Sequence, residues 1–128
     1  MEGKDPGAER LRFLVRVVTR QAHYLEQTHQ RLFAGAALTQ AALNKLDNDP
    51  EFAERVEAFV SRFSRLQDSL GDKLLPTLLA YAGEPPRTVV ENLDRAEKLG
   101  WLPSADTWMM LRKLRNQMVH EYVEDIAI

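Results

Sequence analysis

Apolar residues recur along most of this chain at steps of three and four, the spacing of one face of an α-helix. In the first stretch the recurring positions are Leu11, Leu14, Val15, Val18, Ala22 and Leu25. Gly35 then offers a break in the pattern. The spacing therefore predicts a first long helix that begins near Ala8 and ends between Arg31 and Ala34.

Two further helices are predicted before the middle of the chain ends. Residues 36–46 form a short one, and Asp49 and Pro50 are a good N-cap and first helical residue for the next. The apolar positions of that third helix form a narrow packing seam, which consists of Phe52, Val56, Phe59, Phe63, Leu66 and Leu70. The apolar pattern continues to Tyr81, and Pro76 predicts a kink or a restart after Leu75.

The last third of the chain predicts two more helices. One begins near Pro86 or Arg87 and is stopped by Gly100, and Ser104 caps the other. No segment alternates with period two for long enough to form a strand. We therefore expect an all-α fold, a four- to five-helix up-and-down antiparallel bundle, with residues 1–7 as a flexible leader and residues 8–128 as one helical domain.

Composition narrows the classes of function. The chain has 128 residues, 45% hydrophobic and 28% charged, which suits a single globular domain. Its net charge of -2 argues against a diffuse polyanion-binding surface, so any nucleic-acid contact must be a local patch. There is no cysteine, which excludes disulfides, thiol catalysis and Cys-based zinc sites and fits a reducing cytoplasm. The polar start of the chain has no signal-peptide pattern, and no apolar run approaches the roughly 20 residues of a membrane span, so a cytoplasmic location is expected.

Three arginines of the first helix share one face. Arg12, Arg16 and Arg20 follow one another at intervals of four residues. They offer a strip for a phosphate backbone or an acidic partner, or they are simply a solvated face, and the sequence leaves these alternatives open. His23 and His29 point to different faces, since a helical metal pair needs a spacing of three or four, and both are interpreted as ordinary histidines.

The last helix carries an arginine on its apolar face. With Trp108 at zero and about 100° per residue, the apolar arc is roughly 140° wide. Its other members are Leu111, Leu114, Met118, Val119 and Tyr122. Arg115 lies inside this arc, so its guanidinium must be paired or must open onto an interface or cleft. Asn116 and His120 share one flank of the helix.

The candidate chemistry is concentrated in this C-terminal stretch. Arg115 is a permanent cation suited to phosphate, and His120 exchanges a proton near neutral pH. Asn116 donates and accepts hydrogen bonds, and Tyr122 carries a nucleophilic phenol. The purely structural alternative is that Arg115 holds a carboxylate of the third helix, such as Asp68, while His120 caps the helix end. In that third helix, Asp68 and the nearby Asp72 favour ion pairing or capping over a metal site, because two carboxylates alone specify little.

The stretch Arg115-Asn116-x-x-x-His120-x-Tyr122 resembles the signature of the HEPN domain superfamily, and more narrowly that of the HepT-type toxins. In those toxins an arginine, four residues, a histidine, any residue and a tyrosine stand near the C-terminus of a small helical chain. The run from Arg62 to Leu74 also looks like the long helix of the family, and the resemblance covers most of residues 8–125.

The resemblance implies a homodimer with the motif helices at the interface and a composite active site. It implies a metal-independent endoribonuclease without a cofactor, in which His120 is the general acid or base and Arg115 holds the scissile phosphate. Asn116 would orient either His120 or the phosphate. The products are a 2′,3′-cyclic phosphate and a 5′-hydroxyl. The implied partners are an RNA substrate and a cognate nucleotidyltransferase antitoxin that transfers AMP to Tyr122 and so blocks the nuclease.

A second function stays open at this point. The chain is mildly acidic, whereas RNA-binding proteins are usually more basic. A non-catalytic HEPN subunit that binds a nucleotidyltransferase or a nucleotide, without cleaving RNA, is therefore the alternative to the toxin nuclease.

Overall fold

The computed structural model describes residues 5–33 and 44–119, and within these ranges every regular element is helical. The elements are α1 (Pro6–Phe33), α3 (Pro50–Asp68), the π-helical segment η1 (Ser69–Leu74), α4 (Leu75–Tyr81), α5 (Val89–Lys98) and α6 (Ala105–Val119). The predicted all-α bundle is thus confirmed. The short helix predicted at residues 36–46 lies almost entirely outside the described residues, as does most of the predicted leader.

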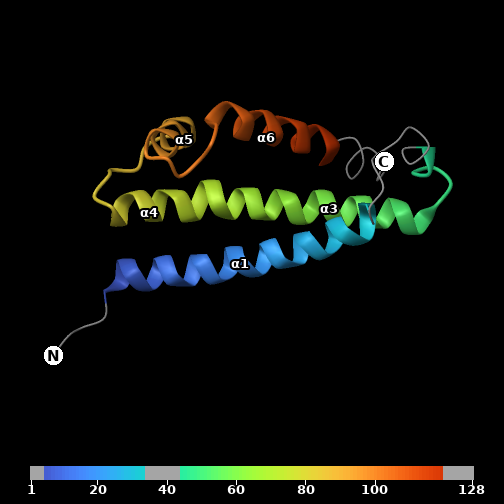
Figure 1. Cartoon of the computed structure of the whole chain (residues 1–128), viewed down its shortest axis with the longest axis horizontal. Helices are drawn as coiled ribbons and strands as arrows, with labels where there is room; N and C mark the ends of the chain where they lie inside the picture. The colour runs from blue at the N-terminus through green and yellow to red at the C-terminus, as the bar shows by residue number, and fades with distance from the viewer. Residues whose placement is uncertain (1–4, 34–43, 120–128) are drawn as a thin grey trace.

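A single long rod organises the bundle (Figure 1). The elements α3, η1 and α4 follow one another without a break, α1 runs antiparallel along one side of this rod, and α6 runs along the opposite side. The helix α5 crosses the end of the rod next to α4 and leads the chain back into α6. The rod is therefore covered from two sides, and α6 is presented at the edge of the molecule.

The core follows from this two-sided cover. The buried apolar side chains come from every helix, and they are Leu14, Val60, Leu79, Leu93, Ala96 and Ala105. On the rod, the predicted aromatic seam is only half-buried at Phe59 and Phe63, whereas Ser64 and Gln67 are buried. The predicted seam thus lies beside the most buried face of α3. A helix that packs between two others, here α1 and α6, buries the surface that faces each of them and the surface in between.

Pro76 does not interrupt the rod, but an α-helix does restart beside it, as predicted to within one residue: α4 begins at Leu75 with Pro76 in its first turn. The irregularity lies one turn earlier, in η1, where the Leu75 N–H donates to Leu70 O, five residues back. Asp68, Leu74 and Leu75 all keep right-handed helical backbone angles. The wide turn absorbs the proline, which lacks an N–H and crowds the preceding turn of a regular α-helix.

The predicted helix ends are mostly confirmed. The Asp49 side chain accepts from the Phe52 N–H at 3.2 Å, and Ser104 Oγ accepts from the Thr107 N–H at 3.1 Å. Gly100 follows α5 with a φ of +80°, the left-handed conformation that favours glycine. The start of α5 is corrected to Val89, because Thr88 accepts from the Glu91 N–H and caps the helix there.

Candidate functional site

The helix α6 presents a different face to the rod from the one its apolar pattern predicts. Leu111 and Leu114, which belong to the predicted core arc, are 37% and 51% exposed. The face that packs against the rod keeps Trp108 and Arg115 of the predicted arc and adds Ala105 and Arg112. The buried face of α6 is therefore rotated about the helix axis from the predicted arc. The rotation is somewhat more than half of the roughly 100° between consecutive residues.

Arg115 is paired with Asp68 across α6 and α3. Arg115 Nη2 lies 2.5 Å from Asp68 Oδ1, and Nη1 donates to Asp68 Oδ2 at 3.4 Å. The Arg115 side chain is 11% exposed, whereas that of Asp68 is 46% exposed. Both carboxylate oxygens are thus engaged by one guanidinium, the two-point geometry in which arginine binds oxyanions best. The structure confirms the alternative in which Arg115 holds Asp68.

Three more contacts fix the rotation of α6. Arg112 Nη1 lies 3.4 Å from Asp72 Oδ1, and Gln67 Nε2 donates to Trp108 O at 3.2 Å. The indole of Trp108 lies over Gly71, where an added Cβ would stand 3.2 Å from Cζ2. The rod therefore offers α6 a strip of two carboxylates, an amide and a glycine, and this strip selects the arginine-bearing face over the leucine-bearing one.

Asn116 points away from the rod, next to two cations. It is exposed and lines a shallow hollow with Met109, Arg112, Lys113 and Gln117. Two cationic and two amide side chains on one helix face suit an anionic group such as phosphate. Arg112 and Lys113 were missed by the sequence analysis, although Arg112 precedes Asn116 by four residues and Lys113 by three, the spacing of neighbours on a helix.

The remaining two predicted site residues, His120 and Tyr122, lie outside the described residues. Arg115 and Asn116 both belong to α6, but Arg115 faces the rod and Asn116 faces outward. These two side chains thus flank one edge of the helix and do not converge on a single point.

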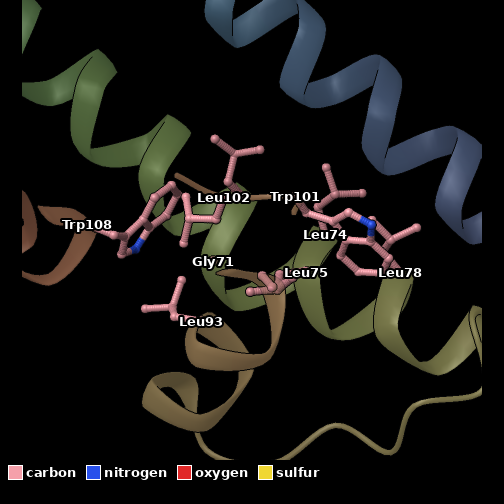
Figure 2. Close-up of a pocket in the computed structure, with 10 residues that line it drawn as sticks. Gly71, Leu74, Leu75, Leu78, Leu93, Trp101, Leu102 and Trp108 are labelled. Atoms are coloured by element: carbon pink, nitrogen blue, oxygen red, sulfur yellow. The ribbon is translucent and has the colours of Figure 1, made fainter. Parts of the chain in front are cut away.

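Behind α6, the rod and α5 line a hydrophobic pocket, open to one side, with a volume of about 190 Å³ (Figure 2). Leu74, Leu75 and Leu78 come from the rod, Leu93 from α5, and Trp108 from α6. The other lining residues are also apolar, and they are Leu70, Gly71, Ala96, Trp101 and Leu102. This pocket contains no acid, base or cation, so the candidate chemistry stays on the polar surface of α6.

Comparison of the chain with profiles of known protein families, with curated proteins and with solved structures gives no match. Within residues 5–33 and 44–119, no three His, Asp or Glu side chains gather closely enough to hold a metal ion. In the same ranges, no helix is both long and apolar enough to cross a lipid bilayer.

Proposed function

We propose that this chain is a HepT-like toxin, an endoribonuclease neutralised by a nucleotidyltransferase. The observation that carries the proposal is the sequence motif of Arg115, Asn116, His120 and Tyr122, of which Arg115 and Asn116 lie on α6 of a small all-α bundle. Arg115 is the motif residue whose setting is best defined, because Asp68 holds its guanidinium in one orientation at the edge of α6.

The proposed reaction uses the side chains of this motif, with further positive charge from its neighbours on α6. His120 removes the proton of a ribose 2′-hydroxyl, the 2′-oxygen attacks the adjacent phosphorus, and the bond to the 5′-oxygen breaks. A proton returned to the 5′-oxygen leaves a 5′-hydroxyl and a 2′,3′-cyclic phosphate. Arg115, with Arg112 and Lys113 nearby on α6, supplies the positive charge that stabilises the phosphorane.

The proposal includes a homodimer built on α6. Met110, Leu111 and Leu114 are 62%, 37% and 51% exposed, and they form an apolar stripe on the side of α6 that the rod leaves uncovered. Two copies of α6 packed through this stripe would bury six large side chains and bring Arg115 of each copy to the edge of the interface, with Asn116 on the far side of the helix. The composite active site of the proposal would form at this edge.

One observation favours the second function, a non-catalytic subunit that binds a nucleotidyltransferase or a nucleotide. Asp68 already satisfies Arg115 at two points, so the guanidinium attracts a phosphate less strongly than a free one would. In that case α6 would serve as a binding surface, with its exposed stripe covered by the partner.

Growth and cleavage assays separate the two functions. Expression of the wild-type chain alone should arrest growth, and His120→Ala should relieve the arrest while leaving the helical circular dichroism unchanged. Arg115→Lys keeps the charge near Asp68 but loses the two-point geometry, and it should lower cleavage of RNA at least about 100-fold. A purified, folded wild-type protein that cleaves no RNA and is not toxic would leave the binding subunit as the function.

Modification of Tyr122 gives the second test. Co-expression with a nucleotidyltransferase encoded beside this chain should add the mass of one AMP to the peptide that contains Tyr122. Tyr122→Phe should remain toxic and should escape neutralisation. AMP on another residue, or neutralisation of Tyr122→Phe to the wild-type extent, would contradict the proposed regulation.

A further inference from the structure

The helix α1 carries a positive charge that the rest of the chain does not share. It contains five arginines and two glutamates, so its charge is +3 with neutral histidines, whereas the whole chain carries -2. Arg12, Arg16 and Arg20 are exposed, and none of them forms an ion pair with another residue in ranges 5–33 and 44–119. The charge of these guanidinium groups is therefore open to a ligand.

Exposed aromatic rings lie among these arginines. Phe13 and Tyr24 are 47% and 46% exposed, and the step of eleven positions from one to the other makes about three helical turns, so they share a face about 17 Å apart along the axis. Arg20 projects within about 40° of both rings. The guanidinium carbon of Arg10 lies 5.8 Å from the centre of the Phe13 ring, and that of Arg62 lies 5.8 Å from the centre of the Tyr24 ring.

The pair at Tyr24 is held rigidly from two helices. Arg62 comes from α3, and its Nη1 donates to Tyr24 O at 3.0 Å and to Thr28 Oγ1 at 2.5 Å. Thr28 is 6% exposed, and its hydroxyl also donates to Tyr24 O at 3.1 Å. Arg62 thus reaches the ring from a fixed anchor, so the flat surface of ring and guanidinium is formed before any ligand binds.

We infer that this face of α1, the arginine–aromatic face, binds single-stranded RNA. It is defined by Phe13, Tyr24 and the arginines Arg10, Arg12, Arg16, Arg20 and Arg62. Flat rings interleaved with unpaired guanidinium groups are what a single strand requires, because bases stack on the rings while the cations follow the backbone. The choice of RNA as the single strand rests on the proposed function. The inference that this face binds a single-stranded nucleic acid does not.

The helix α1 lies on the side of the rod opposite to α6 (Figure 1). The strand held here is therefore a part of the RNA distant from the cleaved phosphate. Such a contact adds affinity for longer strands without taking part in the bond-breaking step.

The test measures binding of a fluorescein-labelled oligouridine of about 15 nucleotides by anisotropy, with His120→Ala protein so that the strand stays intact. Arg12→Gln, Arg16→Gln and Arg20→Gln combined should weaken binding and should reduce the slope of log K against log [salt] by about 2, since each contact to single-stranded phosphate contributes about 0.7. Tyr24→Leu keeps an apolar side chain but removes the stacking surface, and it should weaken binding about fivefold or more at every salt concentration. Phe13→Leu should do the same.

A charge-matched control separates a local contact from net charge. Lys45→Gln, Lys73→Gln and Lys98→Gln combined remove three exposed cations elsewhere on the chain, and they should leave the slope unchanged. Equal losses for the two triple variants, or full affinity in Tyr24→Leu and Phe13→Leu, would overturn the inference. Loss of antitoxin binding in the arginine variant, with RNA binding intact, would assign the face to the protein partner instead.

The outcome for this face is distinguishable from that of the proposed function. A chain that binds oligouridine through α1 but cleaves nothing would keep the inference and remove the nuclease. A chain that cleaves RNA with the arginine–aromatic face neutralised, at unchanged affinity and salt slope, would keep the nuclease and remove the inference.

Discussion

Arg115 on α6 and Asp68 on α3 bind each other at two points, with the guanidinium 11% exposed and the carboxylate 46% exposed. This asymmetry has two consequences. The cation is largely withdrawn from water and depends on its partner, whereas the carboxylate remains reachable from solvent. The pair therefore stabilises the packing of α6, and it also sets how much positive charge the predicted site offers to a phosphate.

Removal of the Asp68 carboxylate should therefore destabilise the fold. Asp68→Asn leaves the guanidinium half-satisfied in a mostly buried position, and we expect the free energy of unfolding to fall by about 1–3 kcal/mol. Urea denaturation followed by circular dichroism measures the change. The control is Asp72→Asn, whose partner Arg112 is 3.4 Å away with both side chains roughly a third exposed, and this variant should cost less than about 1 kcal/mol. Equal costs would show that burial of Arg115 is not the cause.

Gly71 is predicted to matter through Trp108. The Cβ of Gly71→Ala would stand 3.2 Å from Trp108 Cζ2, and we expect this crowding to outweigh the gain in helix propensity, for a net loss of about 1 kcal/mol. In a Trp108→Leu background the crowding is gone, so the same substitution should stabilise the protein by up to about 1 kcal/mol. Thermal and urea unfolding of the wild type, the two single variants and the double variant measures the change in stability caused by Gly71→Ala in each background. A loss of the same size in both backgrounds would place the cause in the backbone of η1.

The contact between α5 and the rod should depend on Leu93. This side chain is 1% exposed, and Leu93→Ala should cost about 2–5 kcal/mol, because it removes buried apolar surface beside an existing pocket. Val90→Ala on the same helix is the matched control, since Val90 is 52% exposed, and it should change stability by less than about 0.5 kcal/mol. Denaturant midpoints at constant slope give both values.

The proposed dimer should depend on the apolar stripe of α6. Leu114→Glu places a charge in the middle of the stripe, and sedimentation equilibrium should then show a monomer at concentrations where the wild type is a dimer. Val90→Glu introduces the same charge at a similarly exposed apolar position on α5 and should leave the dimer intact. A wild type that sediments as a monomer, or a Leu114→Glu protein that remains a dimer, would contradict the α6 interface.

The described helices could be predicted from local features of the sequence. Their apolar period, the Asp49 and Ser104 caps and the left-handed glycine at Gly100 are local features, set by residues within one turn of each other. Pro76 shows the limit of such reasoning, because the turn that accommodates it is made by the residues before it, from Ser69 to Leu74.

Which face of α6 is buried depends on contacts with the other helices. The apolar period of α6 favoured the leucine face, but packing depends on the surface opposite, and the rod presents Gln67, Asp68, Gly71 and Asp72 there. Charge complementarity with that strip turned Arg115 inward and left Leu111 and Leu114 outside. The sequence could name Asp68 as a partner for Arg115. Whether Arg115 pairs or stays exposed depends on contacts between α6 and α3, and the pattern of one helix alone does not contain this information.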